Sequence, residues 1–197
     1  MTTQSRKPYE IRLVNDYPFD EVASALQKSI RRNEEYDACY WAFIIHESGY
    51  YKYVWKRLMI IASEDVGNGT PEAALIVHAL QQNYQNSIIA ANRTKNDALQ
   101  FIMQAVIYMC RADKSREADS TTNLIRSRFE LGEFLDIPDY AVDVHTKRGR
   151  SLHGKWGEGT EGENTERHRK WYEIWSKVQP DVGDRYLEPL RKLKGLE

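Results

Sequence analysis

The chain has 197 residues, of which 41% are apolar, and its formal net charge is −1. This length suffices for one hydrophobic core with a small appendage. A nearly neutral molecule does not attract nucleic acid as a whole, so such a partner requires a local basic patch. No apolar run reaches the roughly 18 residues of a membrane span, and residues 1–10 lack the apolar segment of a signal peptide. We therefore expect a cytoplasmic protein, compatible with nucleoid association, with Cys39 and Cys110 as reduced thiols.

Helical signals begin near Phe19, where Asp20 is the expected N-cap of the first helix. The second helix is expected to begin at Asn33 and to end at Gly49. It is apolar around most of its circumference, which is typical of a central helix in a bundle. A third helix is expected over about 51–66.

The fourth helix has a strong start signal in Thr70-Pro71-Glu72, and a polar link over 83–95 is expected to follow it. The fifth helix has the clearest amphipathic pattern of the chain. Its apolar residues recur at i, i+3, i+4, i+7, i+8 and i+11 between Ala98 and Met109. A sixth helix over about 116–131 has a weaker pattern and depends on Ile125 and Phe129 for its anchoring.

The pattern changes near Pro138. Residues 140–144 read as a short strand or a helical turn, and 145–162 are rich in glycine and charge without an apolar period, which favours a loop or a disordered segment. A final aromatic helix is expected to end at Pro180. Trp171 within this helix, with Trp156 and Trp175, is a candidate base-stacking residue.

Two glycine patterns imitate nucleotide-binding motifs, and each lacks chemistry that the motif requires. Residues 149–156 nearly match a P-loop, but Trp156 replaces the hydroxyl that binds magnesium, and a poor helix start follows. Residues 157–162 spell G-x-G-x-x-G, yet Glu158 and Glu161 would repel a pyrophosphate. We interpret the second pattern as a linker and expect neither a cofactor nor ATPase activity.

The histidines show no ligand spacing that specifies zinc, so no metal ion is expected. A basic run over 145–155 contains no acid, and such a run can contact phosphates. It can equally be a solvated loop whose charge is balanced by the glutamates that follow. The candidate DNA-binding residues are Lys147, Arg148, Arg150, His153 and Lys155.

Ordered motifs in the helical body resemble those of one known family. They are ALQKSIR at 25–31, ACYWA at 38–42, RLMIIASEDVG at 57–67, then PEA at 71–73, QAVIYM at 104–109 and Lys114-Ser115. Together these motifs resemble the C-terminal region of the replication-associated recombination AAA+ ATPases, a family with bacterial members and eukaryotic Werner-helicase-interacting relatives. The residues that carry the family signature are Lys28, Arg31, Tyr40, Trp41, Arg57, Ser63, Glu64, Asp65 and Gly67.

The resemblance covers about 20–125 and implies an all-α, multi-helix orthogonal bundle of stacked helical hairpins, similar to the clamp-loader collar. It also implies a tetramer that acts at stalled or damaged replication forks. The ATPase module of the family has no counterpart in this chain. Conversely, residues 143–150 of this chain have no counterpart that we can assign in the family pattern. We interpret Ser63-Glu64-Asp65 as the polar exit of a buried helix that holds a turn or a neighbour, because acids at a helix C-terminus oppose its dipole.

The expected organisation is an N-terminal arm (1–18), a helical collar-like domain (19–137) and a loop-rich extension with an aromatic helix (138–197). The favoured function is a non-enzymatic, oligomerising module of DNA replication or repair. Its expected partners are further copies of itself, DNA, and a separate AAA+ ATPase or replication proteins. One alternative is an enzyme whose acid–base cleft contains His145, His153 and the Glu64-Asp65 pair. Another is a protein-interaction adaptor that does not contact nucleic acid.

Overall fold

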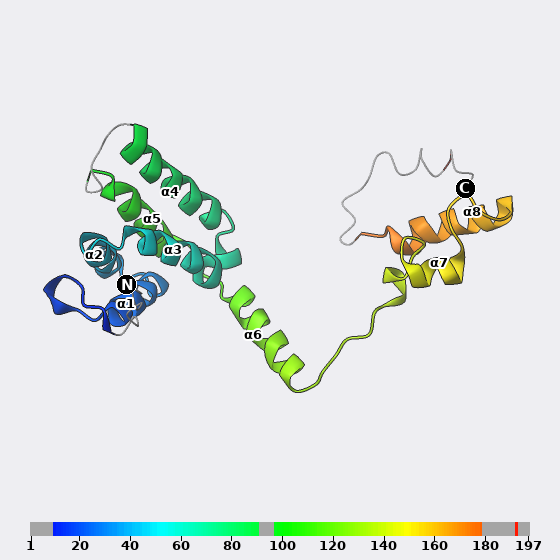
Figure 1. The fold of residues 1–197 in the computed structure, drawn as a ribbon, viewed down its shortest axis with the longest axis horizontal. Coiled ribbons are helices and arrows are strands. Elements are labelled where there is room, and N and C mark those ends of the chain that lie inside the picture. The colour runs from blue at the N-terminus through cyan, green and yellow to red at the C-terminus, as the bar shows by residue number, and fades with distance from the viewer. Residues whose placement is uncertain (1–9, 91–96, 179–191, 193–197) are drawn as a thin grey trace, which may run out of the picture. The chain divides into compact units, whose positions relative to one another are not determined.

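A computed structural model describes residues 10–90, 97–178 and 192 of the chain. These residues contain eight α-helices and several short 3-10 and π turns, and the only β pairing among them is an isolated bridge between Arg12 and Pro18 (Figure 1). The expected all-α fold is confirmed. No helix in the described part is long and apolar enough to cross a membrane.

Contacts within the chain group it into two compact units, Met1–Gly132 and Glu133–Glu197, which are described separately below. The expected arm, collar-like domain and extension stay a prediction. Most of the N-terminal arm, part of the polar link at 83–95 and the helix end at Pro180 lie outside the described residues.

The first unit contains the helices α1 to α6 (Figure 1). Helix α1 packs against α2, α2 against α5, and α4 against α5, so that α2 and α5 are central. The elements are η2 (Val14–Asp16), α1 (Phe19–Arg31), α2 (Glu35–Glu47), α3 (Tyr51–Ile61), the π turn η3 (Ala62–Val66), the 3-10 turn η4 (Gly67–Gly69), α4 (Ala73–Ala90), α5 (Leu99–Arg111) and α6 (Glu117–Glu130).

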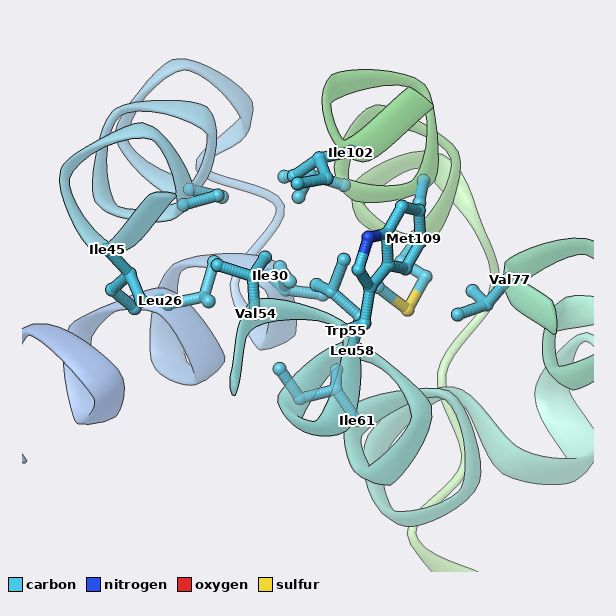
Figure 2. Close-up of a cluster of buried hydrophobic side chains, with 14 of the residues drawn as sticks. Leu26, Ile30, Ile45, Val54, Trp55, Leu58, Ile61, Val77, Ile102 and Met109 are labelled. Atoms are coloured by element: carbon cyan, nitrogen blue, oxygen red, sulfur yellow. The ribbon is translucent and has the colours of Figure 1, made fainter. Parts of the chain in front are cut away.

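The hydrophobic core is formed by residues from all five helices α1 to α5. Figure 2 shows Trp55 of α3 beside Met109 of α5. The amphipathic pattern predicted for the fifth helix is confirmed: its stripe is buried, with Phe101 partly buried. Cys110 lies on the same helix, and burial raises the pKa of its thiol to about 12. Cys110 and the half-buried Cys39 are both free thiols in the structure.

Two helix starts differ from the prediction. Helix α1 follows Pro18, so Asp20 lies in its first turn and is not the N-cap. Helix α2 follows Glu34, whereas Asn33 has a φ of 62° and forms the turn between the two helices. Asparagine tolerates this left-handed conformation better than most residues, so the turn uses it for backbone geometry and not for capping.

The polar link expected over 83–95 is wrong for its first part, because α4 continues to Ala90. The polar residues there occupy the outer face of the helix, and Tyr84 points inward. Tyr84 is 1% exposed, and its hydroxyl hydrogen-bonds with Nε2 of His46 at 3.1 Å. Burial raises the pKa of Tyr84 to about 12.

The sixth helix exists, but its apolar residues do not anchor it. Ile125 and Phe129 are 63% and 64% exposed, and none of the residues of α6 is buried. Figure 1 shows α6 extending away from the other helices of its unit, and its contacts are made mainly with η3 and η4.

The second unit contradicts the loop expected over 145–162. It contains η5 (Asp139–Ala141), α7 (Lys147–His153), α8 (Glu161–Lys170) and the π turn η6 (Trp171–Trp175). The Thr146 side chain accepts a hydrogen bond from the Gly149 backbone N–H, and a capping box between Thr160 and Glu163 starts α8. Such caps satisfy the first N–H groups of each helix, which offsets the glycine-rich composition. Of the strand and the helical turn considered for 140–144, the turn is present at its start.

Candidate functional site

The family-like signature ends in a π turn that directs one carboxylate into the protein. In η3 the wider turn leaves Ser63 on the surface and Glu64 partly exposed, while the side chain of Asp65 is fully buried. A buried carboxylate loses its hydration, so it requires charged or hydrogen-bonding partners nearby. Single π turns within helices are frequent at functional positions.

Both oxygens of the Asp65 carboxylate have donors from other elements. Nε of Arg31 on α1 lies 2.6 Å from Oδ1, and Nε2 of Gln27 donates to Oδ2 at 2.7 Å. Nε of Arg116, just before α6, lies 3.5 Å from Oδ1. The backbone joins the same point, because the Ser115 N–H lies 3.1 Å from the Asp65 carbonyl oxygen. Asp65 therefore connects α1, the end of α3 and the start of α6.

Glu64 extends this network toward the surface. Gln27 Nε2 donates to Glu64 Oε1 at 2.9 Å, and Arg31 and Arg116 place nitrogens 3.7 and 3.9 Å from the same oxygen. Arg57 donates to the amide oxygen of Gln27, which fixes the orientation of that amide. Gln27, which sequence reasoning did not select, is thus the centre of the network. Its position one helical turn before Arg31, on the same face of α1, was the available signal.

Gly67 permits the close approach of two segments beside this network. Its φ is +48°, and a Cβ atom there would lie 2.6 Å from the Ser115 carbonyl oxygen. A side chain is excluded by both conditions, which explains why glycine ends the signature.

The remaining signature residues lie outside the network. Lys28 and Ser63 are exposed, and Ser63 lines an open groove of about 410 Å³ between η3 and α6. The rings of Tyr40 and Trp41 are 5.0 Å apart, and the hydroxyls of Tyr40 and Tyr17 are 3.4 Å apart. This aromatic group holds the segment before α1 against α2.

The candidate DNA-binding residues occupy different environments within the second unit. Lys147 and Arg148 are exposed on α7. Arg150 donates to the His145 carbonyl oxygen at 2.8 Å, and Lys155 lies 3.0 Å from the Glu158 carboxylate. His153 is half-buried, with its ring centroid 5.1 Å from that of Trp175. The five residues therefore do not form one uniform basic surface.

Histidines and tryptophans form a second cluster in this unit. The His145 ring lies 5.2 Å from Trp171, and the Trp156 ring lies 4.9 Å from His168. Nδ1 of His145 is 2.9 Å from the Asp143 carboxylate, and this hydrogen bond lowers the pKa of Asp143. Trp156 and Trp171 are thus both packed against imidazole rings. The centroids of the two tryptophan rings are 6.1 Å apart.

Sequence reasoning also missed Arg167, a buried cation in the described part of the second unit. It is 6% exposed and donates to the His153 carbonyl oxygen at 3.0 Å, to Asn164 Oδ1 at 2.8 Å and to the Glu158 carbonyl oxygen. Through these hydrogen bonds Arg167 holds the end of α7 and the segment that follows it against α8. Hydrogen bonds from Thr160, and secondarily the charge of Arg167, lower the pKa of Glu163.

The two glycine patterns have structural roles here. Gly149 of the P-loop-like pattern lies inside α7, where a Cβ atom would meet the Asp143 carbonyl oxygen at 1.7 Å. Gly157 and Gly159 lie in the turn before α8, and Gly162 lies in its first turn. Neither pattern forms the phosphate-binding loop between a strand and a helix that these motifs need.

The groups required by the enzyme alternative belong to different units. Glu64 and Asp65 lie in the first, and His145 and His153 lie in the second. In the first unit the donors described above already engage both oxygens of Asp65. No group of three or more His, Cys, Asp or Glu side chains in the described residues is arranged to hold a metal ion.

Comparison with known proteins identifies the family. The family model described as MgsA AAA+ ATPase C terminal matches residues 34–159. The chain belongs to this family. The MgsA C-terminal match reaches beyond α6 and through α7, so the block 143–150 does have a counterpart in the family, contrary to the motif comparison. The expected range of the likeness, 20–125, was therefore too short at its C-terminal end.

Individual relatives agree with this assignment. The chain is 34% identical over 145 residues to replication-associated recombination protein A of Haemophilus influenzae, covering 73% of this chain and 30% of the relative. It is 34% identical over 132 residues to the protein of the same name from Escherichia coli K12, covering 66% and 27%. ATPase WRNIP1 of Dictyostelium discoideum is 28% identical over 144 residues, covering 73% and 15%. The chain thus spans less than a third of the length of these relatives.

Proposed function

We propose that this MgsA C-terminal-type chain is a non-enzymatic, oligomerising module of DNA replication and repair that also contacts DNA. The proposal for assembly rests on the exposed apolar side chains of α6 and its C-terminal end, because exposed apolar patches often mark interaction sites. These residues of the first unit are Leu124 (52%), Ile125 (63%), Phe129 (64%) and Leu131 (79%).

A second copy of the chain is the proposed occupant of this surface. The resemblance to the family suggests a tetramer, and an apolar patch can pair with itself around a two-fold axis. Leu124, Ile125 and Phe129 lie within one side of α6, so opposing copies can bury them together. The exposed cations of α7, Lys147 and Arg148, make the proposed contact with DNA.

The first test is the mass of the full chain in solution. On a sizing column with light scattering, we expect a multiple of the 23.0 kDa protomer, and four copies by family resemblance. Ile125→Asp places a charge in the proposed interface and is expected to yield protomers. Leu75→Asp is the matched control, because Leu75 is a leucine that is 73% exposed on another helix, α4. A wild-type protomer mass at high protein concentration would contradict the proposal.

The second test is the salt dependence of DNA affinity. Each phosphate contact contributes a slope of about −0.7 to −0.9 to a plot of log affinity against log salt. We expect Lys147→Ala with Arg148→Ala to weaken binding and to reduce the steepness by roughly one to two contacts. Lys56→Ala on α3 is an exposed control in the first unit. Absence of binding to single- and double-stranded DNA at low salt would leave the pure adaptor as the better description.

A further inference from the structure

The second unit contains a half-open cavity of about 230 Å³ between α7 and η6. Its wall is mainly apolar, with side chains of Val142, Leu152, Ile174 and Trp175. Cavities for drug-sized ligands are usually about 300–1,000 Å³. The volume of this cavity therefore suits one small planar group.

Aromatic side chains provide a stacking surface in the cavity. Trp175 is half-buried, and its ring lies 5.1 Å from His153 at an interplanar angle of 52°. Every nucleobase has a π face that stacks on tryptophan or histidine, largely independent of sequence. Trp156 and Trp171, the other two candidates, are packed against His145 and do not line this cavity. Its position in the cavity wall thus distinguishes Trp175 among the three tryptophans.

Charged side chains border the same cavity. Arg148 comes from α7 and Lys170 from the end of α8, and within the described residues neither of them is in a salt bridge. Asp139 also lies in the wall, where its carboxylate can accept a hydrogen bond from a base amino group. Two cations around an aromatic cavity with one acceptor fit a nucleotide better than an isolated phosphate, which the carboxylate would repel.

We propose that this cavity holds one unpaired base of single-stranded DNA, stacked against Trp175 and His153, while Arg148 and Lys170 contact the adjoining phosphates. The inference rests on the DNA contact in the proposed function and names its form. A paired base must first leave its stack, which costs a few kcal/mol. The cavity therefore selects single strands over duplexes.

The test compares two labelled strands of equal length and charge, measured by fluorescence anisotropy on the full chain. One is oligodeoxycytidylate, and the other is an abasic deoxyribose phosphate strand. We expect the wild type to bind the first about tenfold more tightly, since one stacked base contributes about that much. Trp175→Ala should bind both strands with the lower affinity, and Trp175→Phe should retain most of the difference.

Controls separate the base contact from the phosphate contact. Tyr36→Ala removes an 82% exposed aromatic ring of the first unit and should change neither affinity. Arg148→Ala and Lys170→Ala should each lower the affinity for both strands by the same factor. Equal wild-type affinity for the two strands, or for a single strand and a duplex, overturns the base cavity while leaving the phosphate contact intact. If neither strand binds, the DNA part of the proposed function fails as well.

Discussion

Replacing Asp65 with alanine is expected to lower the free energy of unfolding by about 3 kcal/mol, because removing one member of a buried ion-pair network leaves its partners without compensation. The amide of Gln27 loses one acceptor, and the guanidinium groups of Arg31 and Arg116 lose their closest shared carboxylate. The arginines are partly exposed, so water recovers some of this loss, which keeps the value at the lower end of such effects.

Urea unfolding followed by far-ultraviolet circular dichroism measures this change. The matched control is Glu64→Gln, because Glu64 lies in the same network but its side chain is 31% exposed. Its expected cost is less than about 1 kcal/mol. If Asp65→Ala and Glu64→Gln cost the same, burial of Asp65 does not organise the network, and the stabilising role assigned to it is wrong.

Arg167→Met is expected to open the second unit locally, with a loss of about 3 kcal/mol. The substitution keeps an apolar chain of similar length but leaves three acceptors without their donor, at about 1 kcal/mol each. Those acceptors lie on His153, Glu158 and Asn164. Hydrogen exchange of the α7 and α8 amides measures the effect, because it reports local opening separately from global unfolding.

Arg169→Met is the control for this experiment, since Arg169 is an exposed cation two residues away that bonds to Glu166 and Glu173. We expect no measurable change in exchange for this variant. Faster exchange across α1 to α5 in Arg167→Met would show that the effect is global, which contradicts a role confined to the second unit.

The helical body could be predicted wherever burial determines the sequence pattern. The stripe from Ala98 to Met109 repeats with the period of a helix and is buried as expected. Asp65 was recognisable as an acid at a helix exit, and Arg31 as a signature residue, but their pairing was not, because Arg31 and Arg116 are both remote from Asp65 in sequence. A pairing of this kind depends on how whole helices pack, which local patterns do not encode.

The second unit was harder to predict because its helices are short and polar. Thr160 and Glu163 form a recognisable capping-box pattern, and Thr146 precedes α7 as a cap, yet the glycines between them favoured a loop. Arg167 gave no signal at all, since it stands in a run of charged residues from Glu166 to Lys170. Its burial is set by the segment that folds around it.

The way α6 is held determines how it responds to its surroundings. Its start is held by the hydrogen bonds and ion pairs of Ser115 and Arg116, and none of its own side chains is buried. Charge interactions weaken as ionic strength rises, whereas apolar packing does not. We therefore expect the attachment of α6 to weaken as ionic strength rises, while the apolar core of α1 to α5 stays intact.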